Sequence, residues 1–267
     1  MGILQTLRTA FGAKPGPQAS LKWLSNDRFR LDGLEFHTTI GDYDKRTTQQ
    51  EIVLLKPRAF VDTYLSLLER VQAKNVLEFG IWQGGSALFL AAAGKLDRLV
   101  GIDIGEPLPA VQSILANHPV GRSVRLHFNT SQDDIPRVRS IVESEFGATP
   151  LDMIVDDASH FYAETRASFQ ATFGYLRPGG VYVIEDWGWA HWPEWQDPNH
   201  IWREREALSN LLFEITMAIG SKARQIAKIE ILSGAMVVIT RGHGLAHGAP
   251  FDLSQQILAR GRQLNRI

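Results

Sequence analysis

The sequence predicts an α/β protein with a doubly wound, mostly parallel sheet of seven strands, an antiparallel C-terminal hairpin and a helical N-terminal extension. Short apolar runs rich in β-branched residues alternate with helical segments from residue 75 onward, which is typical of a parallel sheet with crossover helices. Only Ser233-Gly234-Ala235 separates the last two runs, and so short a connection predicts a hairpin. The 267 residues, 44% of them hydrophobic, suffice for one such domain with its own core.

The first 56 residues are predicted to form an N-terminal extension or lid. A short apolar helix is expected at its start, and the Pro- and Gly-rich segment 13–17 ends it because these residues interrupt helices. Residues 18–50 are mixed and polar, and no regular element is predicted there. Apolar residues then recur at helical spacing, which predicts an amphipathic helix over residues 57–71.

The alternating core is predicted to extend over residues 57–242, followed by a C-terminal tail at 243–267. Its predicted strands are 75–79, 98–104, 124–128, 151–155, 181–184, 226–232 and 236–239. Its predicted helices are 86–93, 110–117, 136–146, 163–176 and 205–219. The Pro178-Gly179-Gly180 segment is expected to end the fourth of these helices, because proline and glycine disfavour its continuation.

The composition excludes several classes of protein. With 28 basic and 29 acidic residues and scattered arginines, the chain gives no electrostatic argument for binding nucleic acid. The absence of cysteine excludes disulfides, thiolate metal sites and cysteine nucleophiles, and it fits a cytoplasmic protein. No apolar run approaches the length of a membrane span. A homo-oligomer is compatible with the sequence.

Acidic residues follow two of the predicted strands, at the point where each strand ends. The sequence Asp156-Asp157-Ala158-Ser159-His160 comes directly after the strand at 151–155, and Glu185-Asp186 follows the strand at 181–184. In an α/β sheet, catalytic groups collect at the carboxyl ends of the strands. We therefore expect these two segments to carry the chemistry of the protein.

The residue types in these segments indicate a divalent cation beside a general base. Asp157, Glu185 and Asp186 offer only oxygen ligands, which suit Mg²⁺, Ca²⁺ or Mn²⁺ rather than zinc. A bound cation makes a substrate hydroxyl easier to deprotonate. Imidazole titrates near neutral pH, so His160 is the predicted base. The alternative interpretation is that the carboxylates cap helices and that the histidine is structural.

The segment 78–86, Glu-Phe-Gly-Ile-Trp-Gln-Gly-Gly-Ser, is a nucleotide-type turn at the end of the first core strand. Its glycines let the backbone approach a ligand, and the helix start supplies N–H groups. Glu78 replaces the first glycine of a dinucleotide fingerprint and suits an amino group or a sulfonium. Asp103 ends the second strand, where an acid accepts hydrogen bonds from ribose. The candidate cofactor-binding residues are Glu78, Gly80, Trp82, Gly84, Ser86, Asp103, Gln132, Asp133 and Asp156.

The pattern over residues 75–240 resembles class I S-adenosylmethionine-dependent methyltransferases, which have a Rossmann-like fold. Asp-Asp-Ala-Ser-His at 156–160 and Pro-Gly-Gly-Val-Tyr-Val-Ile-Glu-Asp at 178–186 are similar to the macrocin and mycinamicin type of Mg²⁺-dependent sugar O-methyltransferase. The resemblance implies that the metal ligands are Asp157, Glu185 and Asp186, and that the base is His160. It also implies S-adenosylmethionine as the methyl donor and a methyltransferase domain at residues 57–242.

The activity that this resemblance implies is methyl transfer to a sugar hydroxyl of a glycoside, an oligo- or polysaccharide, or a glycosylated natural product. An Mg²⁺-dependent methyltransferase of catechols or phenols is one alternative. A catalytically silent scaffold that binds S-adenosylmethionine is another. Glu78 disfavours a dinucleotide oxidoreductase, because its charge would repel a pyrophosphate.

Five tryptophans follow the proposed metal ligands, between residues 187 and 202. Exposed indole faces suit sugar rings, but the same residues also suit a core or a dimer contact, and both interpretations stay open. The candidate substrate residues are Trp187, Trp189, His191 and Trp192. His243 and His247 have the spacing of a metal pair, but neighbouring glycines disfavour the helix that would align them, and a surface tail is expected.

Overall fold

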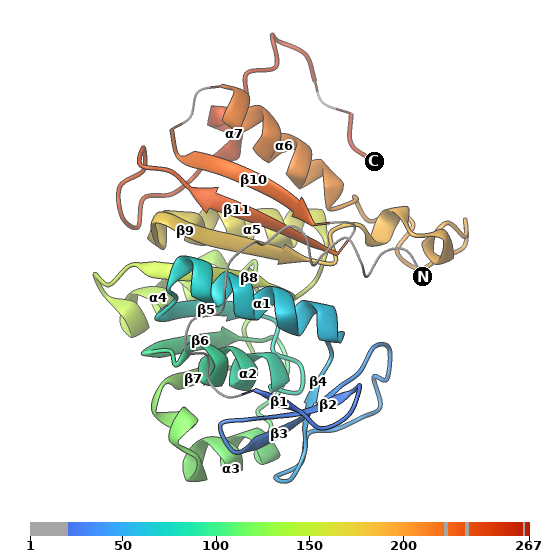
Figure 1. Cartoon of the computed structure of the whole chain (residues 1–267). Coiled ribbons are helices and arrows are strands. Elements are labelled where there is room, and N and C mark those ends of the chain that lie inside the picture. The colour runs from blue at the N-terminus through green and yellow to red at the C-terminus, as the bar shows by residue number, and fades with distance from the viewer. Residues whose placement is uncertain (1–20, 222–223, 233–234, 264) are drawn as a thin grey trace. The chain divides into compact units, whose positions relative to one another are not determined.

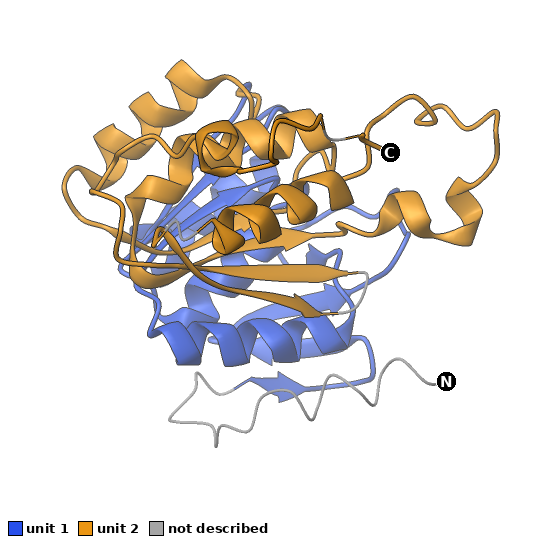
Figure 2. Ribbon diagram, turned by 90° about the horizontal axis from the view of Figure 1, so that it is seen from above, with its two compact units in different colours: residues 1–129 blue, residues 130–267 orange. Residues whose placement is uncertain are grey.

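The structure is a computed structural model, and it describes residues 21–221, 224–232, 235–263 and 265–267. The chain divides into two compact units, residues 1–129 and 130–267 (Figure 2). The short helix predicted before segment 13–17, and positions 233 and 234 of the predicted hairpin turn, lie outside the described residues.

The predicted fold class is confirmed. The strands of the larger sheet are β5 (Asn75–Phe79), β6 (Arg98–Ile102), β7 (Val124–His127), β8 (Leu151–Asp156), β9 (Leu176–Glu185), β10 (Ile226–Leu232) and β11 (Met236–Arg241). In the described chain they form a seven-stranded sheet in the order β10-β11-β9-β8-β5-β6-β7 (Figure 1). The pairs β5–β6, β6–β7 and β8–β9 are parallel, whereas β11 is antiparallel to both β9 and β10.

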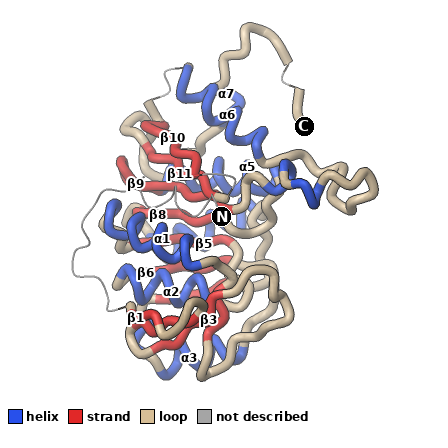
Figure 3. The backbone as a smooth tube through the Cα atoms, turned by 45° about the vertical axis from the view of Figure 1, so that its right-hand side comes forward, coloured by secondary structure: helices blue, strands red, loops and turns tan. Residues whose placement is uncertain are grey.

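Helices follow most of the core strands, as the alternating pattern predicts (Figure 3). They are α1 (Arg58–Val71), α2 (Gly85–Gly94), α3 (Pro109–Asn117), α4 (Ile135–Phe146), α5 (Tyr162–Thr172), α6 (Ser209–Gly220) and α7 (Leu253–Gln256). Short 3₁₀ turns are η2 (Pro119–Arg122), η3 (Phe173–Tyr175), η4 (Trp189–His191) and η5 (Pro193–Trp195). Among the described residues, no helix is both long and apolar enough to cross a membrane.

The helix predicted at 163–176 is shorter than expected. It ends at Thr172, and β9 already begins at Leu176, before the Pro-Gly-Gly segment that was expected to end the helix. Leu176 pairs with Leu151 and Val181 pairs with Met153, so the register shifts between these two positions. The Pro-Gly-Gly segment therefore lies in an irregular stretch of β9, where proline and glycine are tolerated.

The N-terminal extension contains β-strands in its described part, where the sequence analysis assigned no regular element. Its strands are β1 (Lys22–Trp23), β2 (Arg28–Leu31), β3 (Leu34–Thr38) and β4 (Ile52–Leu54). Asp32 and Gly33, with φ of +50° and +86°, make the two-residue turn between β2 and β3. The rings of Phe29 and Phe36 stack at 4.8 Å, and each meets the edge of Phe89 in α2, at 5.9 and 6.3 Å. The extension therefore contributes to the core of the first unit.

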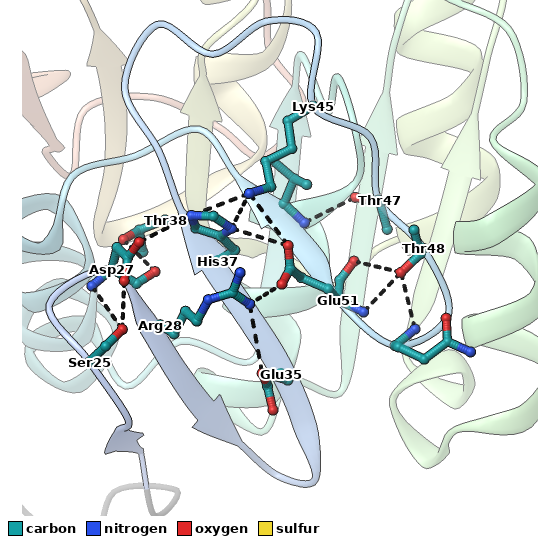
Figure 4. Close-up of polar contacts among 12 residues, drawn as sticks. Ser25, Asp27, Arg28, Glu35, His37, Thr38, Lys45, Thr47, Thr48 and Glu51 are labelled. Atoms are coloured by element: carbon teal, nitrogen blue, oxygen red, sulfur yellow. Dashed lines mark hydrogen bonds and ion pairs between the residues drawn. The ribbon is translucent and has the colours of Figure 1, made fainter.

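Charged side chains pair around this small sheet (Figure 4). Glu51 accepts a hydrogen bond from Arg28, and its carboxylate lies 3.1 Å from His37 Nδ1 and 3.5 Å from Lys45 Nζ. His37 Nε2 lies 3.3 Å from an oxygen of Asp27. Burial raises the pKa of Glu51, but the hydrogen bonds from Arg28 and His37 lower it more, so this pKa lies below its ordinary value of 4.5. The ion pairs tie Lys45, in the connection from β3 to β4, to the sheet.

The C-terminal tail is anchored rather than wholly on the surface. Phe251 is buried and meets the ring of Phe169 in α5 at a centroid distance of 5.8 Å. His243 and His247 are both exposed, and His247 packs edge-on against the ring of Tyr175 at 5.6 Å. These two histidines are not among the described groups of side chains that could hold a metal ion.

Candidate active site

The turn after β5 has the backbone conformation that its glycines allow. Glu78, in β5, is buried, and the chain then turns through Gly80 and Gly84, with φ of +80° and +76°. A side chain at position 84 would also press against Val111, because a Cβ there would lie 2.7 Å from its Cγ2. Ser86 is buried in the first turn of α2. The first unit thus presents a tight strand-to-helix turn of the kind expected around a nucleotide-like ligand.

Asp103 holds this turn in place. Its Oδ2 accepts hydrogen bonds from the backbone N–H groups of Ile81 and Trp82, at 2.7 and 3.0 Å, and its Oδ1 accepts one from Gly105 at 2.7 Å. Trp82 has φ of +38°, a conformation that costs energy for a residue with a side chain, and these bonds stabilise it. That Asp103 also contacts a ribose stays a prediction.

The connection between β3 and β4 holds the same turn from outside the sheet. The backbone N–H of Thr47 donates to Gln83 Oε1 at 3.1 Å, and its hydroxyl donates to the carbonyl of Gln83 at 2.8 Å. The same hydroxyl accepts a hydrogen bond from the N–H of Val53 in β4. The ring of Tyr43 meets that of Trp82 edge-on at 6.5 Å. Sequence reasoning missed Thr47, because a polar residue 36 positions from its partner carries no local signal.

In the second unit, the predicted metal ligands and base come together in part. Asp157, His160 and Asp186 each offer one ligand atom, and these atoms lie within 4.8 Å of one another. His160 Nε2 is 3.8 Å from Asp157 Oδ1, and both side chains are 23% exposed. Ligand atoms of one ion, each about 2.0–2.6 Å from it, lie at such separations. The cluster is therefore of the right size for one divalent cation and open to solvent.

Glu185, the third predicted ligand, is not part of this cluster. It is the last residue of β9, 2% exposed, and it stands opposite Met236 of β11. Asp186 follows the end of β9 and has φ of +48°, so the alternation of side chains along a regular strand does not decide whether Glu185 and Asp186 face one ion. Its role as a ligand stays a prediction, and the structure places His160 in the group instead.

Two residues of the cluster have unusual backbone conformations. His160 has φ of +59° and Asp186 has φ of +48°, which is the left-handed region. The N–H of Asp186 donates to the carbonyl of Ala235 at 2.7 Å. Such conformations persist where the surrounding structure holds them, and they gather at functional sites.

Asp156, a predicted cofactor contact, is 2% exposed and bonded within the protein. It accepts hydrogen bonds at 2.6 Å from the hydroxyls of Ser168 and Tyr182. Burial raises the pKa of Asp156 to about 6, and these hydrogen bonds limit the rise. Burial and the neighbouring Asp156 raise the pKa of Tyr182 well above its ordinary value. The geometry gives Asp156 a role in orienting its neighbours.

Gln132, predicted to read an adenine edge, links Asp156 to the loop that carries the cluster. Its Nε2 lies 3.2 Å from Asp156 Oδ1, and its Oε1 accepts a hydrogen bond from the N–H of Ser159 at 2.8 Å. Asp133 is exposed and accepts a hydrogen bond from the hydroxyl of Ser131. The contacts of Gln132 and Asp133 with a cofactor stay predictions.

Trp189 is buried, which favours core packing over substrate contact among the two interpretations left open for the tryptophans. It is 5% exposed and packs edge-on against Phe161, Trp195 and Trp202, with ring centroids 6.0, 5.6 and 5.5 Å away. Arg205 lies 4.6 Å from the ring centroid of Phe161. These contacts support a packing role for Trp189, and a contact with substrate stays a prediction.

The other candidate substrate residues remain accessible. Trp187 and Trp192 are half-buried and His191 is exposed. His191 Nε2 lies 2.9 Å from the hydroxyl of Ser209, at the start of α6. Their role in substrate binding stays a prediction.

Comparison with known proteins supports the resemblance that the sequence indicates. In Micromonospora griseorubida, mycinamicin VI 2''-O-methyltransferase is 31% identical over 131 residues, 46% of this chain and 30% of that protein. Demethylmacrocin O-methyltransferase of Streptomyces fradiae is 30% identical over 131 residues, again 46% of this chain and 30% of that protein. The chain thus matches less than a third of the length of these relatives.

A solved structure is similar over a larger part of the chain. It is the MycE methyltransferase of the mycinamycin biosynthetic pathway in complex with Mg, SAH and mycinamycin VI, with a TM-score of 0.52 and 25% identity. The similarity covers 69% of this chain and 48% of that chain. Residues 77–187 match the family model of a methyltransferase domain, and this part of the chain is therefore identified as a methyltransferase domain.

Proposed function

We propose that this chain transfers a methyl group from S-adenosylmethionine to a hydroxyl group of a sugar, with a divalent cation such as Mg²⁺ at the cluster of Asp157, His160 and Asp186. The observation that carries the proposal is this cluster, in which two carboxylates and an imidazole converge within 4.8 Å. The sugar O-methyltransferases that match 46% of the chain support the choice of acceptor.

The donor set of the cluster fits a hard divalent cation. Asp157 and Asp186 would hold it through carboxylate oxygens, which Mg²⁺ and Mn²⁺ prefer. Both are half-buried, so an ion and a substrate hydroxyl have access from solvent. When bound, such a cation supplies Lewis acidity, which lowers the pKa of a coordinated hydroxyl.

His160 is proposed as the general base. Its Nε2 would accept the proton of the sugar hydroxyl, whose oxygen then attacks the methyl group in line while the C–S bond breaks and a neutral thioether leaves. Asp157 Oδ1 lies 3.8 Å from His160 Nε2. The negative charge of this carboxylate would stabilise the imidazolium that forms when His160 takes the proton. A nitrogen whose lone pair binds a metal cannot also accept a proton. The metal affinity of a His160 variant therefore distinguishes a base, whose loss leaves the affinity unchanged, from a ligand, whose loss lowers it.

The turn of the first unit is proposed to bind the methyl donor. Glu78 suits the cationic amino group of its methionine part, and Asp103 suits the ribose hydroxyls. A reaction in the cytoplasm and a saccharide-bearing small molecule as the partner belong to the same proposal. The absence of cysteine from the chain is compatible with a reducing compartment.

The test is a methyl-transfer assay with labelled S-adenosylmethionine and a panel of deoxysugar glycosides, oligosaccharides and catechols, with and without a chelator. Turnover of a glycoside that stops with the chelator and returns with Mg²⁺ is the expected result. Turnover of a catechol alone would replace the sugar by a phenol as the acceptor. Binding of S-adenosylmethionine without turnover of any acceptor would indicate a scaffold.

A further inference from the structure

Trp189 makes hydrogen bonds to both segments that carry the cluster. Its indole Nε1–H donates to the backbone carbonyl of His160 at 2.7 Å, and its backbone N–H donates to the carbonyl of Asp186 at 3.2 Å. His160 belongs to the loop after β8 and Asp186 follows β9, 26 positions later in the chain. One buried residue therefore connects the two segments through their backbones.

The two residues that it contacts are those with left-handed backbone conformations, φ of +59° at His160 and +48° at Asp186. A residue with a Cβ adopts this region at an energetic cost, so the conformation depends on contacts that the alternative conformation would lose. In each case Trp189 donates to the carbonyl of that residue. These bonds fix the peptide group that follows each residue, which restricts the ψ angle of that residue and so helps to maintain its backbone conformation.

The position of Trp189 is itself fixed by packing. Its ring is 5% exposed and lies between Phe161, Trp195 and Trp202. Phe161 directly follows His160, so the ring cluster and the hydrogen bond act on the same loop. A buried indole N–H needs an acceptor, and here the acceptor is the carbonyl of His160.

We propose that Trp189 is a positioning residue for the metal cluster: by bonding the backbones of His160 and Asp186, it holds the loop that carries Asp157 against the segment that carries Asp186, so that the two carboxylates lie at the separation that a divalent cation requires. The inference rests on the proposed function in one respect, that the cluster binds such a cation. It assigns to Trp189 a role that involves no contact with substrate, cofactor or metal.

A purely structural role in the ring cluster is the competing explanation, and a matched pair of variants separates the two. Trp189→Phe keeps an aromatic ring and removes the N–H that bonds His160. Trp202→Phe makes the same change in the same cluster, at a ring 5.5 Å from that of Trp189. In the described part of the chain, the Trp202 indole makes no hydrogen bond to Asp157, His160 or Asp186. The two variants differ in the contact with His160 and share the loss of ring area.

The experiment is a titration of the full chain with Mn²⁺ followed by electron paramagnetic resonance, with no substrate present, alongside thermal melting of each variant. We expect Trp189→Phe to weaken Mn²⁺ binding by about fivefold or more, the effect of one lost hydrogen bond. Trp202→Phe should lower the melting temperature to a similar extent and leave Mn²⁺ affinity within about twofold of wild type. In the methyl-transfer assay, Trp189→Phe should raise the Mg²⁺ concentration needed for half-maximal turnover and leave the KM for S-adenosylmethionine unchanged.

Unchanged Mn²⁺ affinity in Trp189→Phe would overturn the proposal, and so would an equal loss in Trp202→Phe, which would indicate general loosening of the ring cluster. If Trp189→Phe does not fold, Trp189→Leu paired with Trp202→Leu makes the same comparison, because leucine also has no side-chain donor. Asp157→Asn, which removes a proposed ligand charge, is the positive control for loss of Mn²⁺. A wild-type chain that binds no Mn²⁺ would contradict the metal site of the proposed function and the role of Trp189 together, whereas wild-type binding with an indifferent Trp189→Phe contradicts only the latter.

Discussion

The turn after β5 and the loops after β8 and β9 all contain residues with left-handed backbone conformations, but different groups stabilise them. These residues are Trp82 in the first unit and His160 and Asp186 in the second. In the first unit a carboxylate, Asp103, accepts the backbone N–H groups of the turn. In the second unit neutral groups, the indole of Trp189 and the carbonyl of Ala235, bond the backbone.

The two regions also differ in the groups that lie next to their carboxylates. The charge of Asp103 is shared with the protein's own N–H groups, so the turn is shaped before any ligand arrives. The charges of Asp157 and Asp186 converge instead on one another, and like charges at such short range repel unless a cation or a proton lies between them. The groups that bond the backbone of His160 and Asp186, the indole of Trp189 and the carbonyl of Ala235, are thus neutral.

The largest expected effect follows from removing a charge from the second region. Asp157→Asn should lower turnover by more than about 100-fold, because a metal ligand matters at least as much as the groups that orient it. Chelation of the wild type should have the same effect, reversed by added Mg²⁺. Activity is measured as methyl transfer, and the melting temperature serves as the control. Full activity of the chelated wild type would make the carboxylates structural.

Replacing the proposed base should come next. His160→Ala should lower turnover by about 10²- to 10⁴-fold, the usual contribution of a general base. Mn²⁺ affinity should stay near that of the wild type, because the proposed ligands are carboxylates. Loss of Mn²⁺ binding together with activity would instead make His160 a ligand, as its place within the cluster allows.

A smaller effect is expected in the first region, where the carboxylate shapes the turn. Asp103→Ala should weaken S-adenosylmethionine binding by about tenfold or more, because charged hydrogen-bond acceptors contribute about 1.5–3 kcal/mol. It should also lower the melting temperature, since the N–H groups of Ile81 and Trp82 lose their acceptor. Glu106→Gln changes an exposed carboxylate of the same loop and should do neither. Calorimetry measures the affinity, and equal affinity in both variants would contradict the assignment.

A smaller effect on cofactor binding is expected from the hydrogen bond that Thr47, in the connection from β3 to β4, donates to this turn. Thr47→Val removes the hydroxyl that donates to the carbonyl of Gln83 and should weaken S-adenosylmethionine binding by about threefold to tenfold. Thr48→Val is the matched control, since among the described residues the hydroxyl of Thr48 bonds its own loop, at Gln50 and Glu51. A comparable loss in both variants would show that the loop as a whole, and not its contact with Gln83, supports the turn.

The smallest effect concerns the ion pairs around the N-terminal sheet. The pKa of Glu51 is lowered in the folded state, so its ionised form stabilises the fold above the ordinary value of 4.5, and this stability is lost as the pH falls below it. Glu51→Gln should therefore show a weaker fall in stability between neutral pH and the acid range than the wild type. Urea unfolding at a series of pH values measures the difference, and parallel curves would contradict the assignment.

Much of the core could be predicted from the sequence, because its strands are continuous apolar runs that end in polar residues. The N-terminal sheet could not, because strands such as β1 and β4 are two and three residues long and give no periodic signal. The Asp32-Gly33 pair is the one clear hairpin signal in that region.

In the site, the sequence indicated which segments carry the chemistry but not which side chains converge. Glu185 and Asp186 are adjacent and both acidic, and the end of the β9–β11 pairing at Glu185 decides which one leaves the sheet. The burial of Trp189 depends on rings as distant in sequence as Phe161 and is therefore a property of the fold.

The close packing between the N-terminal sheet and α2 has a consequence for recombination among relatives. A side-chain carbon at Gly85 would overlap the carbonyl oxygen of Val53 in β4, and Phe89 closes against Phe29 and Phe36. A chimera that joins the first 56 residues of another protein to this domain must therefore import the matching face of α2, or accept a displaced turn after β5. Crossovers placed after Gly94 keep both partners together, and we expect these chimeras to be the ones that fold.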